Sequence, residues 1–232
     1  MSKGMHHLLS REDKGVYEAK KTPAIMWRSI LRDLQVSPKV WDRLINRYVK
    51  KHGQDNKNTQ SSDRGNHRRA LARDDIGRWR TLQLGLEILA PKSISYELYL
   101  EWDPVEYAKE KPEYIYFAPT TKHNHLREIF QKLIGLLNLT PSAWDLAIRY
   151  YVDQIGTDNP TEIGWWRSNI HKQIFSKGTV EKNLTWKMFC RGLKILRVRK
   201  MDFIINLEFS RKTTRHIFYV DISEEDQVND DD

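Results

Sequence analysis

The sequence predicts an α+β protein built from two tandem, pseudo-symmetric helical modules, each of about four helices followed by a β-hairpin. Three observations predict it: an internal repeat, apolar residues at helical spacing behind helix-start motifs, and strand-like alternation after the last helix of each copy. The predicted divisions are an N-terminal extension at 1–23, module 1 at 24–118, a linker at 119–123, module 2 at 124–222 and a disordered acidic tail at 223–232.

The repeat needs a single gap to align the two modules over most of their length. A shift of 103 positions aligns the first part, and a shift of 107 aligns the rest. The aligned identities include Pro38/Pro141, Trp41/Trp144, Asp42/Asp145, Tyr48/Tyr151, Gly53/Gly156, Arg64/Arg167, Asn66/Asn169, Trp79/Trp186, Gly85/Gly192 and Leu89/Leu196. An ordered series that contains rare tryptophans is not expected by chance. Two copies are too few for a solenoid, so we expect a pair of related domains.

Four helices are predicted in each module. The first is amphipathic around Trp27 and Phe130, and the second begins where a Ser or Thr cap precedes Pro38 and Pro141. The second helices are expected to end near His52 and Ile155, before the glycines at 53 and 156. The third helices are expected to begin near Asn66 and Glu162, and the fourth to cover about 76–89 and 185–196.

Strands are predicted directly after each fourth helix. Residues 94–100 alternate between apolar and polar side chains, and 114–117 is the expected second strand of that hairpin. In module 2, residues 203–209 are expected to pair with 216–220 through a basic turn. Because an isolated hairpin is marginally stable, each must pack on its own helices or on the other hairpin.

Composition and charge limit the classes of protein that the chain can belong to. The net charge is +8 and the pI is about 9.4, which favours a polyanionic partner such as nucleic acid. Only Cys190 is present, so an internal disulfide is excluded and a reducing, intracellular compartment is expected. No apolar run approaches membrane-spanning length and no secretory signal is recognised. We therefore expect no membrane partner.

A repeated basic pattern at the start of the third helix is the first candidate nucleic-acid contact. A helix N-terminus with Arg and Asn suits a phosphate, although Asn66 and Asn169 are also good helix caps. Basic residues in a first turn oppose the helix dipole, so their presence in both copies hints at an anionic ligand. The residues concerned are Arg64, Asn66, Arg68 and Arg69 in module 1, and Arg167, Asn169, His171 and Lys172 in module 2.

The basic end of module 2 is the second candidate. Its fourth helix and hairpin resemble the winged helix-turn-helix plan in outline, in which a helix enters the major groove and a hairpin touches the DNA backbone. The residues expected to contact nucleic acid there are Lys187, Arg191, Lys194, Arg197, Arg199, Lys200, Arg211 and Lys212. Module 1 is less basic in this region, so module 2 is expected to contribute most of the affinity.

Structural explanations are favoured for two other repeated features. The aligned tryptophans, Trp41/Trp144 and Trp79/Trp186, fall on apolar helix faces, which favours core packing over base stacking. Asp42 and Asp145 recur together with Arg64 and Arg167, which favours an ion pair between helices over catalysis.

No enzymatic signature is recognised, and neither a cofactor nor a metal is expected. Walker A, GxGxxG, HExxH and CxxC patterns are absent from the sequence, and the serines lie in no nucleophile elbow. His123 and His125 lack a third neighbouring ligand. The tail at 223–232 holds 6 acids, which could cover a basic surface, recruit a basic partner or only aid solubility.

The stretch NLTWKMFCRGLKIL at 183–196, with Arg167-Ser168-Asn169 before it, resembles small duplicated proteins of T4-like tailed phages. This resemblance covers mainly module 2. It implies a viral protein of the host cytoplasm that acts in nucleic-acid binding or, associated with the virion, in its assembly.

Together these observations predict a non-enzymatic accessory protein that binds nucleic acid, with DNA favoured over RNA. The alternative is a phage structural or assembly protein whose modules bind a phage or host protein. Both predictions depend on the basic residues gathering on one surface of the folded chain.

Overall fold

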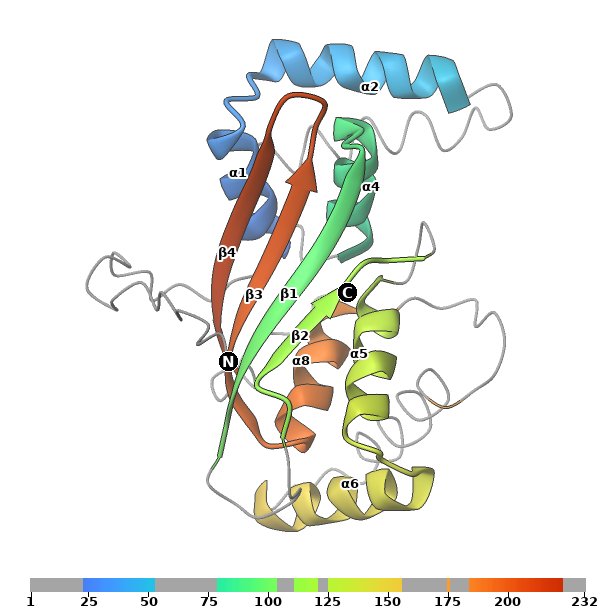
Figure 1. Cartoon of the computed structure of the whole chain (residues 1–232), viewed down its shortest axis with the longest axis vertical. Coiled ribbons are helices and arrows are strands. Elements are labelled where there is room, and N and C mark those ends of the chain that lie inside the picture. Colours follow the sequence, from blue (N-terminus) through green and yellow to red (C-terminus); the bar gives the residue numbers. More distant parts are fainter. Residues whose placement is uncertain are drawn as a thin grey trace, which may run out of the picture.

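The computed structural model describes residues 23–52, 79–103, 111–120, 125–155, 175 and 184–222. Within these ranges it contains six helices and one four-stranded sheet, which confirms the predicted α+β class (Figure 1). The elements in chain order are α1 (Pro23–Asp33), α2 (Pro38–His52), α4 (Trp79–Leu89), β1 (Ser93–Trp102), β2 (Tyr114–Phe117), α5 (His125–Leu136), α6 (Pro141–Ile155), α8 (Trp186–Ile195), β3 (Val198–Glu208) and β4 (Thr213–Asp221).

The two hairpins join into one antiparallel sheet of order β2-β1-β3-β4. The central pairing runs from Ser93↔Glu208 to Trp102↔Val198, so strands from the two halves of the chain form the middle of the sheet. Helices α1, α4, α5 and α8 cover one face, while α2 and α6 lie across opposite ends of the molecule (Figure 1). Each hairpin therefore packs both on helices and on the other hairpin.

Local capping explains where the second helices begin. The Ser37 hydroxyl accepts a hydrogen bond from the Val40 amide at 3.3 Å, and Thr140 accepts one from Ala143 at 3.2 Å. Both helices then begin at proline and end at the predicted residues, His52 and Ile155. The predicted third helices near 66 and 162 lie outside the described residues.

The helices also end alike in the two halves. Non-glycine residues with positive φ occur, within the described ranges, at four helix ends: Gln35 (φ 55°), Ala90 (51°), Asn138 (49°) and Arg197 (68°). The repeat aligns the first with the third and the second with the fourth. The amide after each of the first pair closes the helix by reaching back, Val36 to Leu31 at 2.9 Å and Leu139 to Ile134 at 3.0 Å. Corresponding helix ends therefore share one backbone geometry.

A single apolar core spans both halves of the chain. The repeated tryptophans belong to it, as predicted: Trp41 and Trp144 are fully buried, and Trp79 stacks on Trp186 with ring centroids 5.5 Å apart. On α5, His125 lies beside the buried Tyr96 of β1, with Nδ1 2.7 Å from the tyrosine hydroxyl. Burial, with the nearby Glu128 carboxylate, raises the pKa of Tyr96, so this hydroxyl stays protonated.

Two aligned glycines let helices pack closely on large aromatic rings. A Cβ on Gly85 of α4 would lie 2.7 Å from the Trp27 ring, and a Cβ on Gly192 of α8 would lie 2.6 Å from the Phe130 ring. Trp27 and Phe130 are themselves aligned by the repeat. Glycine at both positions therefore follows from the close approach of an aromatic side chain.

A buried histidine is expected to make folding stability depend on pH. His216 of β4 is 4% exposed, and Nδ1 lies 3.2 Å from Asp33 Oδ2 of α1. Burial lowers the pKa of His216, an effect that Asp33 opposes only in part. Since the unfolded chain then binds a proton more readily, the free energy of unfolding should fall as the pH drops below about 6.5.

Urea unfolding of wild type and His216→Gln at about pH 7.5 and pH 5.5 measures this effect. The decrease in the free energy of unfolding on acidification should be smaller in the variant. An equal decrease in both proteins would show that His216 does not contribute.

Candidate nucleic-acid interface

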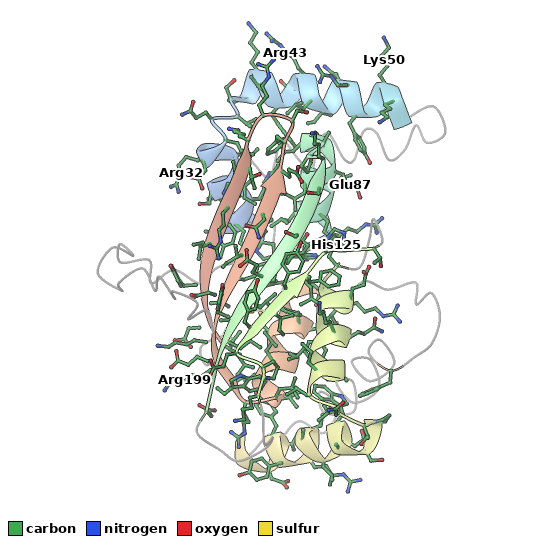
Figure 2. All side chains as sticks on the ribbon, viewed as in Figure 1. Arg32, Arg43, Lys50, Glu87, His125 and Arg199 are labelled. Atoms are coloured by element: carbon green, nitrogen blue, oxygen red, sulfur yellow. The ribbon has the colours of Figure 1, made fainter. Side chains whose placement is uncertain are left out.

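Five basic side chains lie along the outward surface of α2. They are Lys39, Arg43, Arg47, Lys50 and Lys51, all exposed. Successive members of the first four are four or three residues apart, so they follow one side of the helix over about 16 Å at about 1.5 Å per residue. Figure 2 shows Arg43 and Lys50 pointing away from the rest of the molecule. We call these five residues the α2 basic face.

The opposite side of α2 fixes the helix to the body of the protein. Trp41 is fully buried and meets Trp27 of α1 edge to face, with ring centroids 5.1 Å apart. Ile45 is buried one turn later, and the Tyr48 hydroxyl donates a hydrogen bond of 3.1 Å to Glu87 of α4. The helix is thus held by its apolar side, and its basic side is left for solvent or a ligand.

The part of the chain that the structure describes offers no partner that neutralises the α2 basic face. Among the described residues, none of its five side chains makes a hydrogen bond or an ion pair. The helix itself contains a single acid, the half-buried Asp42. Because the cations are about 6 Å apart along the axis, they form a line of charge with a spacing suited to phosphates.

Part of the predicted basic hairpin lies at the same end of the molecule. Arg211 and Lys212 occupy the β3–β4 turn, which is at the α2 end of the sheet (Figure 1), and both are exposed. The next base, Arg215, is paired with Glu97 of β1 at 3.0 Å. The turn can therefore add two positive charges to those of α2.

The other described candidates of module 2 lie away from α2. Arg199 is near the α6 end (Figure 2) and forms an ion pair with Glu101 of β1. Lys200 pairs in register with Glu101 on one side and Asp221 on the other. The Arg197 guanidinium lies 4.9 Å from the Tyr150 ring of α6. Carboxylates or an aromatic ring thus accompany these cations.

The candidate residues on α8 are partly covered by the rest of the molecule. Lys187, Arg191 and Lys194 of α8 are all half-buried. Helix α8 leads directly into β3, which begins near α6, whereas α2 lies at the opposite end of the molecule. The structure therefore does not bring these three residues together with the α2 basic face.

The candidates at the third helix lie outside the described residues. These are Arg64, Asn66, Arg68 and Arg69, with Arg167, Asn169, His171 and Lys172. The predicted ion pairs of Asp42 with Arg64 and of Asp145 with Arg167 lie outside them for the same reason.

The sheet face opposite the helices is a poor site for a polyanion. Its described strands place Glu97, Glu101, Asp202, Glu208 and Asp221 there, together with Lys200 and Arg215, and Arg199 reaches Glu101. Glu97 is the centre of a network and accepts hydrogen bonds from Asn206 at 2.7 Å, Arg215 at 3.0 Å and two tyrosine hydroxyls at 3.4 Å. Burial and this carboxylate raise the pKa of one of them, Tyr114. The acids outnumber the bases on this surface.

The α2 basic face was not among the surfaces expected from the sequence to bind nucleic acid. The expected cations lay at the starts of the third helices and in the fourth helix and hairpin of the second half, whereas α2 was recognised by its apolar side alone. The information was present, because Lys39, Arg43, Arg47 and Lys50 have the spacing of one helix side.

Within the described ranges, no cluster of three or more His, Cys, Asp or Glu residues could hold a metal ion. Nor does any helix there have both the length and the apolar character needed to cross a membrane. Comparison with known proteins finds no family model, curated protein or solved structure that matches the chain.

Proposed function

We propose that this protein binds nucleic acid, and double-stranded DNA in particular, through the α2 basic face together with Arg211 and Lys212 of the β3–β4 turn. The observation that carries the proposal is a line of exposed cations on a firmly packed helix, without an ion-pair partner among the described residues. Cations that are already paired must lose a partner to bind a phosphate, whereas these need only release counterions.

The shape of this end favours DNA over RNA. Helix α2 lies across the end of the molecule (Figure 1), and its Arg43 and Lys50 side chains point away from the other elements (Figure 2). The B-DNA major groove, about 12 Å wide, admits a helix. The major groove of A-form RNA is too deep and narrow for side chains to read. Lysine and arginine contacts to phosphate would give affinity with little sequence preference.

We also propose that the chain is a duplicated pair of modules related by a local two-fold axis. The β1–β3 register supports this: Ser93 pairs with Glu208, while their aligned counterparts, Lys200 and Glu101, pair with each other. The centre of such a pairing is Glu97↔Ile204, two residues that the repeat also aligns. The matched helix ends and the matched glycines are independent support.

Duplication would place α6 as the counterpart of α2, yet α6 lacks the basic face. Arg43, Arg47 and Lys50 align with Leu146, Tyr150 and Asp153. Helix α6 carries one base against two acids. We therefore expect one DNA-binding surface per chain, at the α2 end.

Fluorescence anisotropy with a short labelled duplex, titrated over a series of salt concentrations, tests the proposal. Phosphate contacts from the seven proposed cations should give a slope of log K against log salt of about −6, and binding to random sequences should be nearly equal. Absence of binding at about 50 mM salt, or an affinity that salt does not change, would contradict it.

A further inference from the structure

A groove borders α6 at the end of the molecule opposite the α2 basic face. It has a volume of about 550 Å³ and lies between α6, the end of α8 and the end of β1. Its surface is mainly apolar, and its lining includes Trp102, Leu137, Leu139, Leu146, Tyr150 and Leu196.

The apolar side chains of α6 line this groove and do not fill it. Leu146 is 64% exposed and Tyr150 is 38% exposed, and the small Ala143 and Ala147, one helical turn apart, also line the groove. Small residues at i and i+4 beside large ones leave a channel along a helix, into which the side chains of a second helix can pack.

The rim of the groove is positively charged. Among the described lining residues, Lys111, Arg149 and Arg197 contribute cations, and Asp153 contributes a carboxylate. Two of these cations are held in place: the Lys111 ammonium donates to the Asp103 carbonyl at 3.2 Å, and Arg197 lies over Tyr150. A ligand that carried carboxylates beside an apolar surface would match this pattern.

From this geometry we infer that the α6 groove is the docking site for an amphipathic helix of another protein, with carboxylates flanking its apolar side. Helix-in-groove recognition needs an apolar channel that takes side chains at i, i+3 or i+4 and i+7. The charged rim then selects acidic partners and fixes their orientation.

Other occupants fit the groove less well. A second copy of the chain would bring two rims of the same positive sign together, which costs free energy. A bilayer surface would leave a concave channel unfilled, and a nucleic acid would leave Leu146 and its neighbours without apolar contacts.

The test uses a fluorescein-labelled peptide helix with leucines at the i, i+3, i+4 and i+7 positions and glutamates at most others. We expect it to bind the full-length protein at least about tenfold more tightly than the same peptide with lysine in place of glutamate. Leu146→Asp and Arg149→Glu should each weaken binding at least about tenfold, and neither should unfold the protein because both side chains are exposed.

Arg43→Glu, at the position in α2 that aligns with Leu146, is the matched control and should leave peptide binding unchanged. The inference is overturned if both peptides bind equally, or if Leu146→Asp has no effect. It is also overturned if Leu146→Asp instead abolishes self-association in sedimentation velocity or binding to phosphatidylserine vesicles. These results do not depend on DNA binding, since the two surfaces lie at opposite ends of the molecule.

Discussion

Replacing Arg43, Arg47 and Lys50 together by alanine is expected to lower the affinity for duplex DNA at least about 100-fold at about 50 mM salt. Each cation that no longer meets a phosphate loses the free energy of counterion release, which is largest at low salt. The magnitude of the salt slope should fall by about 3, leaving the contacts made by Lys39, Lys51, Arg211 and Lys212. Anisotropy titrations of the variant and wild type over the same salt series measure both quantities.

The matched control removes three cations elsewhere on the surface: Lys132→Ala, Arg199→Ala and Lys200→Ala. The two variants then have equal net charge, and the control also tests two of the residues expected from the sequence to contact nucleic acid. It should lose much less affinity than the α2 variant, because its cations are remote from α2 or lie beside carboxylates. Equal losses would show that overall charge, and not the α2 basic face, determines binding.

Gly192→Ala is expected to destabilise the protein by about 1–3 kcal/mol, the usual cost of overpacking a core. The added methyl would lie 2.6 Å from the Phe130 ring, which is 1% exposed and cannot move aside easily. Trp144 and Phe189 meet that ring edge to face, at centroid distances of 5.8 and 6.0 Å. Urea unfolding gives the change in the free energy of unfolding.

Substitutions at two other glycines serve as comparisons for Gly192→Ala. Gly135→Ala on the exposed side of α5 meets nothing within 4 Å, so it should stabilise the helix by about 0.5–1 kcal/mol. Gly85→Ala should destabilise the protein as Gly192→Ala does, because its methyl would meet the Trp27 ring at 2.7 Å. A neutral or stabilising Gly192→Ala would mean that Phe130 can repack.

The elements that the sequence predicted well are those whose bounds are set locally. Ser37 and Thr140 cap helices that begin at proline, and the alternation in β1 needs only its own residues to be recognised. The pairing of β1 with β3 is different, because its partners are more than 95 residues apart and only the packed structure selects their register. Whether the hairpins would meet could therefore not be decided from the sequence.

The candidate site likewise has one part that local sequence predicts and one part that it does not. The basic side of α2 is evident from residue spacing alone. The ion pairs of Arg215 with Glu97 and of Arg199 with Glu101 could not be predicted, since each joins strands that are distant in the sequence. These two arginines are bound by carboxylates of β1, whereas Arg211 and Lys212 in the turn remain exposed.

The join between β1 and β3 has a consequence for how such a protein could arise. A pairing that is symmetrical about Glu97 and Ile204 would also serve two identical chains, so an unduplicated ancestor could have formed a symmetric dimer across it. In that dimer both ends must be alike, because one gene encodes them. On the proposed duplication, fusion of two copies would free each end to change alone, so that a line of cations could evolve at one end and an apolar channel at the other.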